Sequence, residues 1–425
     1  MLKKLLFVSL ASIILASSAL AKNKKDEDVN SYELLNLFGE VMERAKATYV
    51  EEITDKQLIE AAINGMLVSL DPHSSYLDAK DFKYMTEQTS GKFGGLGIEI
   101  TMEQSLVKII SPIDDTPAFR AGLKAGDYIT NIDGETIIGM TLNEAVDKMR
   151  GKPGTKVKLT IRRVNEKPFD VTLKREEIKT RSVKTDIKDD DVMYIRISSF
   201  SEDVDLDIKK AFEKETKNRK KPLKGIVLDV RNNPGGLLDQ AVAVSGLFLD
   251  QGEVVSTRAR NEEDTLRYSA KGKDITEGLP VVVLINSGSA SASEIVAGAL
   301  QDHKRAVIIG EKSFGKGSVQ TVVPLGKHGA MRLTTAKYYT PSGKSIQATG
   351  IEPDIVVHPA KVEEFKDEYG FSEAEYTNAL KNETISDNKN KKENKKKNED
   401  DWKKDYQLSR AVDLVKALSV YNVNK

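Results

Sequence analysis

The stretch NSGSASASEIVAGALQD (residues 286–302), followed by SFGKGSVQ (313–320), decides more about this chain than any other part of its sequence. Ser291 stands where an apolar strand is expected to pass into a helix, and Lys316 stands between two glycines further along the chain. A serine hydroxyl is a weak nucleophile until a neighbouring base removes its proton, and a desolvated lysine can be that base. The two segments therefore predict a serine hydrolase in which lysine takes the place of histidine.

Ser291 also fits a purely structural pattern, because Ser291 and Glu294 match the helix capping box S/T-x-x-E. Taken alone, this interpretation would be preferred, since capping serines far outnumber catalytic ones. The two roles share a geometry, because the N-terminus of a helix has a positive dipole field and unpaired N–H groups that can receive an oxyanion. The residue pattern alone does not choose among the four serines of this turn, Ser287, Ser289, Ser291 and Ser293.

Lys316 has an unusual setting for a residue type that is almost always a solvated surface charge. Gly315 and Gly317 let the backbone approach another group closely, and Phe314 is apolar. In an extended segment Gln320 would lie on the same face as Lys316, where its amide could accept a hydrogen bond from the lysine. To act as a base, the lysine needs a pKa lowered by burial from about 10.4 to roughly 7–8.

Two glycine-containing turns are further candidate sites. The segment DVRNNPGGLL (229–238) ends a buried strand and opens a helix, so that Gly235 and Gly236 could offer backbone N–H groups to an oxyanion. The alternative is a tight turn between strand and helix. The segment GGLGIEI (94–100) could hold a terminal carboxylate with its amides while the bound peptide adds to the sheet as an extra strand. The alternative is an ordinary glycine turn.

The N-terminus, residues 1–21, is typical of an export signal. Lys3 and Lys4 form a basic start, an apolar run follows, and ALA at 19–21 is a small-residue cleavage site. The apolar run is short for a membrane span, and an uncleaved anchor is the alternative. We expect a mature protein outside the cytoplasm, periplasmic or associated with the membrane from the periplasmic side.

The periodicity of apolar residues divides the rest of the chain into four regions. We expect a helical region at 22–83 and a β-rich module at 84–175 with one amphipathic helix around Leu142 and Val146. Continuous apolar strands alternate with helices at 176–360, near 237–249 and 292–302, which is typical of an α/β fold. The tail, 361–425, contains a low-complexity linker at 384–400 and a final helix at 403–420.

The composition excludes several classes of site. Lys plus Arg equals Asp plus Glu at 65 each, so the net charge offers no electrostatic argument for nucleic acid as a partner. The absence of cysteine excludes disulfides and a cysteine nucleophile. The four histidines have no metal-ligand spacing, so we expect neither a metal nor a cofactor.

Together these motifs resemble the C-terminal processing peptidases, also called tail-specific proteases. The resemblance extends from about residue 31 to 358 and rests on six stretches: DPHSSY (71–76), GLGI (95–98), AGLKAGD (121–127), RNNPGG (231–236), SASASE (289–294) and FGKG (314–317). It implies a PDZ domain followed by a crotonase-like α/β protease core, with helical flanks at both ends. The linker at 384–400 departs from the family pattern.

The resemblance also implies roles for particular residues. Ser291 corresponds to the nucleophile, Lys316 to the general base, Gln320 to the residue that orients the lysine, and Asp302 to a supporting acid. The oxyanion hole would be formed by the amide of Ala292 and that of Gly235 or Gly236. The PDZ loop would bind the C-terminal carboxylate of the substrate, and a pocket would take its last side chain; the residues concerned are Gly95, Leu96, Gly97, Ile98, Leu142 and Val146.

The expected function is that of a serine endopeptidase acting on exported proteins with apolar or unstructured C-terminal tails. An adaptor protein and a homo-oligomer remain open as partners. Two other interpretations also remain open. The protein would be an inactive scaffold if the PDZ domain only recruits tails, or a histidine-dependent hydrolase if His303 or His328 is the base.

Overall fold

The computed structural model of the chain describes residues 30–361, 363, 380 and 401–422, except 104, 114 and 218. The predicted export signal at 1–21 and the linker at 384–400 lie outside the described residues. Among the helices described, none is long and apolar enough to cross a membrane. The chain divides into two compact units, Met1–Tyr76 and Leu77–Lys425.

The N-terminal unit contains the two helices expected from its apolar spacing, α2 (Ser31–Thr48) and α3 (Asp55–Val68). The first turn of α3 is closed by a capping box between Thr54 and Gln57. After α3 the chain turns where the carboxylate of Asp71 accepts hydrogen bonds from the amides of His73 and Ser74, and a short strand β1 (Ser75–Leu77) follows. The chain therefore leaves the helix through an Asx-type turn.

The second unit begins with α4 (Ala79–Ser90) and the predicted β-rich module. In its main sheet the strand order is β3-β4-β5-β7-β8, all antiparallel, and β6 pairs with β5. The helix predicted around Leu142 and Val146 is α6, which begins with a capping box between Thr141 and Glu144. The bounds are β2 (Lys92–Gly95), β3 (Ile98–Glu103), β4 (Leu106–Pro112), α5 (Pro117–Arg120), β5 (Tyr128–Ile132), β6 (Glu135–Thr136), α6 (Leu142–Met149), β7 (Lys156–Arg162) and β8 (Phe169–Lys174).

A short strand follows the expected end of this module at residue 175. This strand, β9 (Glu176–Lys179), pairs with β2, which leads into the glycine loop. The pairing satisfies backbone hydrogen-bonding groups of β2.

The expected α/β character of the region after residue 176 is confirmed by a six-stranded sheet with the order β10-β11-β12-β15-β16-β19. β10 and β11 are antiparallel, and the other neighbours are parallel. The strands are β10 (Val183–Lys188), β11 (Val192–Ile197), β12 (Gly225–Asp229), β15 (Val281–Ile285), β16 (Ala306–Gly310) and β19 (Ile355–Val356).

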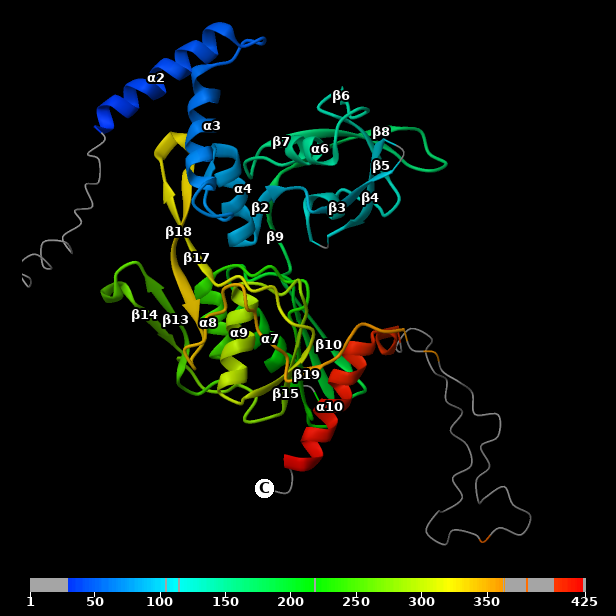
Figure 1. Cartoon of the computed structure of the whole chain (residues 1–425). Helices are drawn as coiled ribbons and strands as arrows, with labels where there is room; N and C mark the ends of the chain where they lie inside the picture. The colour runs from blue at the N-terminus through cyan, green and yellow to red at the C-terminus, as the bar shows by residue number, and fades with distance from the viewer. Residues whose placement is uncertain are drawn as a thin grey trace, which may run out of the picture. The chain divides into compact units, whose positions relative to one another are not determined.

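Both faces of this sheet are covered, which explains the continuous apolar runs of its central strands. In β15, Val281, Val283 and Ile285 join the larger apolar core, whereas Val282 and Leu284 join the core on the opposite face. The larger core contains side chains of α7, α8 and α9, and the smaller one contains α10 (Figure 1). These helices are α7 (Val204–Lys217), α8 (Leu238–Ser245), α9 (Ala292–Asp302) and α10 (Tyr406–Asn422).

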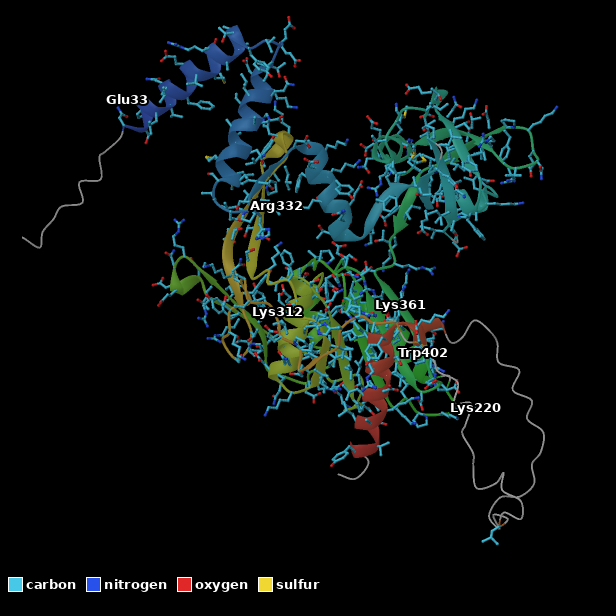
Figure 2. The ribbon with its side chains drawn as sticks, turned by 45° about the vertical axis from the view of Figure 1, so that its right-hand side comes forward. Glu33, Lys220, Lys312, Arg332, Lys361 and Trp402 are labelled. Atoms are coloured by element: carbon cyan, nitrogen blue, oxygen red, sulfur yellow. The ribbon has the colours of Figure 1, made fainter. Side chains whose placement is uncertain are left out.

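Two helix bounds differ from the predicted ones. The helix expected near 237–249 ends at Ser245, and the tight turn after Gly246 carries Phe248 into the core. The final helix, expected at 403–420, begins at Tyr406 after a short 3₁₀ turn, η4 (Asp401–Lys404). The side chain of Trp402 in that turn packs against the same core as α10 (Figure 2).

A second sheet contains the strands that lead away from the candidate lysine. β17 pairs with β18, β18 with β13, and β13 with β14, all antiparallel. Because β17 starts two residues after Lys316, the sheet fixes the end of the lysine loop. The bounds are β13 (Glu253–Ala259), η1 (Glu262–Asp264), β14 (Leu266–Ser269), β17 (Ser318–Pro324), η2 (Gly326–His328) and β18 (Ala330–Tyr339).

Candidate active site

Ser291 occupies a sharp turn between β15 and the first residue of α9. Its backbone has φ 55° and ψ −113°, a left-handed conformation that a residue with a Cβ rarely adopts. Such a conformation costs on the order of 1–3 kcal/mol and persists only where the surroundings impose it. The residue is largely buried, and its backbone amide donates a 2.7 Å hydrogen bond to Glu294 Oε2. The turn thus holds the Ser291 side chain at the N-terminus of a buried helix.

The structure separates the four serines of this turn. Ser289 Oγ donates to the carbonyl of Val230 at 2.8 Å, and Ser293 Oγ donates to the carbonyl of Asn233 at 2.9 Å. Both serines are fully buried, whereas Ser287 is exposed. Ser289 and Ser293 therefore attach the turn to residues 230–233, and Ser291 is the candidate nucleophile.

Glu294 connects the serine turn to the lysine loop. Its carboxylate is fully buried and accepts four hydrogen bonds. Oε2 accepts from the amides of Ser291 at 2.7 Å and Lys316 at 2.9 Å, and Oε1 accepts from Ser313 Oγ at 2.6 Å and the amide of Gly315 at 2.7 Å. From the sequence this residue was only the second half of a capping box. Its bonds to residues 313–316 also bring the two decisive segments together.

The lysine loop is attached to the serine turn by a further backbone bond, in which the amide of Phe314 donates to the carbonyl of Ser289 at 3.0 Å. Gly317 lies against the backbone of Gln347, where a Cβ would come within 2.4 Å of the Gln347 nitrogen. The close backbone approach predicted from the flanking glycines is therefore present on this side of Lys316. The side chain of Lys316 is half-buried.

Gln320 lies on β17 and donates from Nε2 to Ser318 Oγ at 2.9 Å and to Thr334 Oγ1 at 3.1 Å. Ser318 is two residues earlier on the same strand, and Thr334 is the partner of Gln320 on β18. These two bonds fix the amide on one face of the sheet. An orienting contact between its oxygen and the lysine stays a prediction.

The glycine turn lies directly against the serine turn. A Cβ on Gly235 would meet Ser291 Cβ at 2.9 Å and the amide nitrogen of Ala292 at 3.0 Å. The amide of Gly235 donates to Asn233 Oδ1 at 2.9 Å. Within the described residues, the amides of Gly236 and Ala292 donate no hydrogen bond. This arrangement favours Gly236 over Gly235 as the second amide of an oxyanion hole.

Asp302 is the last residue of α9, which places it roughly 16 Å along the helix axis from Ser291 at 1.5 Å per residue. Its carboxylate accepts a 2.9 Å bond from the amide of Ser342. Burial alone would raise its pKa, but hydrogen bonds from Thr340 and Ser342 outweigh it and hold the pKa below the usual range. Asp302 therefore anchors the far end of α9.

The two histidines considered as alternative bases lie on other elements than the serine turn or at the opposite end of α9. His303 caps the same far end of α9, and its Nε2 lies 2.7 Å from the carbonyl of Glu253. His328 is exposed in η2, at the tip of the hairpin formed by β17 and β18. In the part of the chain that the structure describes, no group of three or more His, Asp and Glu side chains could hold a metal ion.

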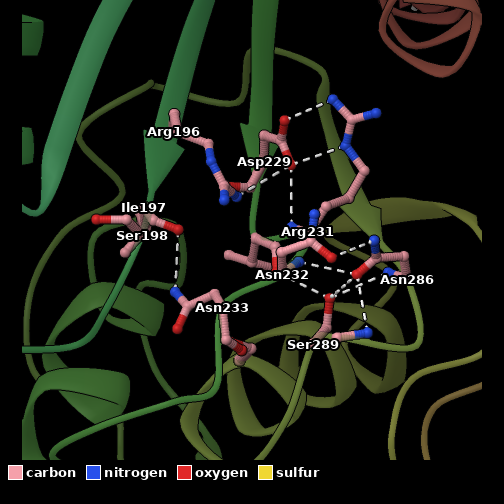
Figure 3. Close-up of polar contacts among 12 residues, drawn as sticks. Arg196, Ile197, Ser198, Asp229, Arg231, Asn232, Asn233, Asn286 and Ser289 are labelled. Carbon is pink, nitrogen blue, oxygen red and sulfur yellow. Dashed lines mark hydrogen bonds and ion pairs between the residues drawn. The ribbon is translucent and has the colours of Figure 1, made fainter. Parts of the chain in front are cut away.

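A polar network surrounds the residues that lead from the end of β12 into the glycine turn (Figure 3). Arg231 donates to both oxygens of Asp229, at 3.0 and 2.7 Å, and Asp229 also accepts from the hydroxyl of Tyr194 at 2.9 Å. Burial and the charge of Asp229 raise the pKa of Tyr194 above its usual range. One residue further on, the amide of Asn232 donates to Asn286 Oδ1 at 2.8 Å. The network therefore connects the ends of β12 and β15.

The β-rich module has a groove of about 200 Å³ where a peptide could bind. β3 is an edge strand of its sheet, so its outer edge can accept an added strand. A Cβ on Gly97 would come within 2.3 Å of Thr116, so the loop before β3 requires glycine there. The groove is lined by Phe93, Gly95, Leu96, Gly97, Ile98, Ile100, Val146, Met149 and Arg150.

Two features of this groove differ from the sequence prediction. Leu142 does not line it, because at the first position of α6 its side chain packs against the core of the module. Arg150, which the sequence analysis overlooked, lines the groove with its guanidinium 4.4 Å from the Phe93 ring and 3.2 Å from Glu87. The sequence indicates this residue only by its position, because Arg150 is a basic residue directly after the amphipathic helix.

Comparison with known proteins identifies three regions of the chain. Residues 191–357 match peptidase family S41, residues 94–175 match the PDZ domain, and residues 8–81 match the N-terminal domain of the activating protease CtpB.

Known relatives match most of the chain. The carboxy-terminal-processing protease of Bartonella bacilliformis is 54% identical over 362 residues, covering 85% of this chain and 82% of the relative. The carboxy-terminal processing protease CtpA of Bacillus subtilis is 36% identical over 83% of this chain and 76% of its own. Among solved structures, the photosystem II D1 C-terminal processing protease matches with a TM-score of 0.45 and 30% identity, over 76% of this chain and 92% of that one.

Proposed function

The chain belongs to the carboxy-terminal processing proteases of peptidase family S41, and from this we propose that Ser291 and Lys316 form the catalytic dyad of a serine peptidase. The observation that carries the proposal is the hydrogen bonding of Glu294, whose Oε2 accepts from the amides of both Ser291 and Lys316. These two bonds hold Ser291, in its strained conformation at the N-terminus of α9, beside the loop that contains Lys316. Such a pairing of nucleophile and base is what serine activation requires.

In the proposed reaction, neutral Lys316 takes the proton from Ser291 Oγ as the oxygen attacks the carbonyl carbon of the scissile peptide bond. The amides of Gly236 and Ala292 donate hydrogen bonds to the resulting oxyanion. When the C–N bond breaks, the protonated lysine gives its proton to the leaving amine, and an acyl-enzyme remains. The same lysine then takes a proton from the water that attacks the ester, and it gives this proton to Ser291 Oγ as the C–O bond breaks and the acid product leaves.

We further propose that the substrates are exported proteins with apolar or unstructured C-terminal tails. The apolar lining of the groove between β3 and α6 supports an apolar last side chain, which would contact Ile98 and Val146. The guanidinium of Arg150 at the edge of the same groove favours a terminal carboxylate. An export signal at residues 1–21 would place the enzyme in the periplasm or at its membrane surface.

The proposal is tested by comparing Ser291→Ala with Ser287→Ala on an unfolded protein that ends in an apolar tail. Products are measured by mass spectrometry, and tail binding is measured separately with a fluorescent C-terminal peptide. We expect Ser291→Ala to lose cleavage and keep binding. Ser287→Ala changes an exposed serine of the same turn and is expected to cleave at the wild-type rate.

Two results would contradict the proposal. Full cleavage by Ser291→Ala would exclude Ser291 as the nucleophile. Tail binding by the wild type without any cleavage, over a panel of tails, would favour the scaffold that the sequence left open.

A further inference from the structure

The C-terminal segment contributes a carboxylate to the network behind the glycine turn. Asp405 precedes α10 and accepts two hydrogen bonds from Arg231, from Nη1 at 3.0 Å and Nη2 at 2.7 Å. Gln407 Oε1 accepts a third from Nη1 at 3.0 Å. On its other edge the same guanidinium is bound by Asp229. Arg231 therefore lies between two carboxylates, one from β12 and one from a segment 174 residues away.

Arg231 is directly followed by the turn on which acyl transfer depends. Asn232 has φ 51°, a left-handed conformation, and is held by a reciprocal pair of side-chain bonds with Asn286. Its amide donates to Asn286 Oδ1 at 2.8 Å, and Asn286 Nδ2 donates to Asn232 Oδ1 at 2.9 Å. Asn286 is also the first residue of the serine turn, where its oxygen accepts from the amide of Gly288. If Arg231 moved, Asn232 next to it would move as well, and the bonds between Asn232 and Asn286 would pass the shift from the glycine turn to the serine turn.

We propose that Asp405 is a positioning residue for the peptidase reaction: by fixing Arg231, it holds the turns that carry the oxyanion amides and the nucleophile in their reactive arrangement. The inference deepens the proposed function and rests on it, because it assumes that the amides of Gly236 and Ala292 receive the oxyanion. The C-terminal segment is then part of the catalytic support of the core.

The charge and burial of the network predict that kcat, rather than the fold, depends on Asp405. Arg231 is 13% exposed and Asp229 is 2% exposed, and the two remain paired without Asp405, which is 37% exposed. Asp229 also pairs with Arg196 at 3.4 Å. Loss of the Asp405 charge therefore leaves each buried charge with a partner, and an unpaired buried charge is what makes a broken ion pair strongly destabilising. The loss weakens the hold on one edge of the guanidinium, which keeps Asp229 and Gln407 as partners but loses its second carboxylate.

The docking of α10 does not depend on Asp405, because the helix also has a buried apolar face. Leu408, Ala411, Val412 and Val415 pack against the sheet with at most 5% of their surface exposed. These side chains provide a separate way to loosen the helix without touching Arg231. Val412→Ala removes buried apolar volume and leaves every bond of Asp405 in place.

The experiment compares Asp405→Asn with wild type, Asp413→Asn and Val412→Ala in the full chain, on an unfolded protein with an apolar C-terminal tail. Asp413 belongs to the same helix and forms an exposed 3.6 Å pair with Arg410, so it is the matched control. kcat and KM are measured together with the midpoint of urea unfolding. Since loss of one oxyanion donor costs about 10²–10³ in kcat, its displacement should lower kcat about tenfold or more. We expect this for Asp405→Asn, with KM changed less than twofold, and wild-type kcat for Asp413→Asn.

Three results would overturn the inference: a wild-type kcat for Asp405→Asn, a loss that appears only in KM, or an equal loss of kcat in Val412→Ala. The last result would mean that helix docking in general, and not the carboxylate, controls the rate. Ser291→Ala is included so that failure of the proposed nucleophile can be recognised separately. The Asp405 comparison keeps its meaning in that case, because kcat is measured on the same substrate for every variant.

Discussion

Glu294 connects the serine turn to the lysine loop, a role that its place in a capping pattern does not indicate. Its two oxygens accept four hydrogen bonds from donors on two separate segments, and it is fully buried. In Glu294→Gln one oxygen becomes an NH₂ group, which faces two donors. Leaving buried donors unpaired costs about 1–3 kcal/mol each. We expect the free energy of unfolding to fall by about 3 kcal/mol and cleavage to fall by about a hundredfold or more.

The measurement combines urea unfolding with cleavage rates, and Glu311→Gln is the control because Glu311 lies just before the same loop and accepts from the exposed His358. Wild-type cleavage rates in Glu294→Gln would show that the carboxylate is not needed to hold the serine turn and the lysine loop in their relative positions.

Residue type and glycine flanks are local signals, so the sequence was sufficient to indicate the serine turn and Lys316, and the family resemblance selected Ser291 among the four serines. The sequence could not show the contacts of Glu294 with residues 313–316, since these depend on how β16 and the following loop return to the start of α9. Nor could it choose between Gly235 and Gly236. That choice depends on the Asn233 side chain, which takes the amide of Gly235.

Within the PDZ domain, Asp127, directly before β5, forms a buried ion pair with Arg163, directly after β7. Asp127 is 1% exposed and accepts from Arg163 Nε at 2.7 Å and Nη2 at 2.8 Å, and from the amide of Lys124 at 2.8 Å. Breaking a buried pair by removing one partner typically costs about 3–5 kcal/mol. We expect Asp127→Asn to destabilise the domain by about 3 kcal/mol, while the exposed Asp170→Asn has little effect.

The same pair predicts how the domain responds to acid. Burial by itself would raise the pKa of Asp127, but the hydrogen bonds from Arg163 and Lys124 outweigh it and lower the pKa. The stabilisation is therefore complete above the unfolded carboxyl pKa of about 3.9 and is lost as the pH falls through the lower folded value. Hydrogen exchange of the β5 and β7 amides, measured between pH 3 and 6, checks both variants. Equal acid sensitivity of wild type and Asp127→Asn would contradict this account.

The helices and strands lie close to the positions that the periodicity of apolar residues predicted, and the differences in helix bounds have local causes. α8 stops at Ser245 because the chain must turn to bury Phe248, a tertiary demand that a window of residues does not reveal. The resemblance gave Asp302 a supporting role. The length of α9 places it at the opposite end of the helix from Ser291, a separation that follows from helical rise alone.

Considered as a whole, the chain exposes an unusual apolar surface on α2, where none of the described side chains is buried. Leu35 is 64% exposed and Phe38 is 46% exposed. Exposed apolar patches of this kind usually mark contact surfaces. We expect the protein to form a homo-oligomer through α2, and the double change Leu35→Asp with Phe38→Asp to reduce its mass by light scattering. Val164→Asp, at an exposed position in the PDZ domain, is expected to leave the mass unchanged. A monomeric wild type would contradict the prediction.

The contact between Arg231 and Asp405 could not have been predicted from the sequence at all. The two residues are separated by 174 positions, and the predicted low-complexity linker at 384–400 lies between them. Each residue alone has the appearance of an ordinary surface charge. They come together only because α10 packs on the face of the sheet opposite α7, α8 and α9.

The central claim, that Lys316 is the base for Ser291, is tested most directly by Lys316→Ala beside Lys312→Ala, with cleavage of an unfolded protein followed from pH 6 to 9 by mass spectrometry. Lys312 lies in the same loop and forms an exposed 2.6 Å pair with Glu352, so it tests the loss of a lysine without the loss of the base (Figure 2). General base catalysis contributes about 10²–10⁴ in rate, so Lys316→Ala should lose at least a hundredfold at every pH while Lys312→Ala keeps the wild-type profile. Wild-type cleavage by Lys316→Ala, with the same products, would contradict the account.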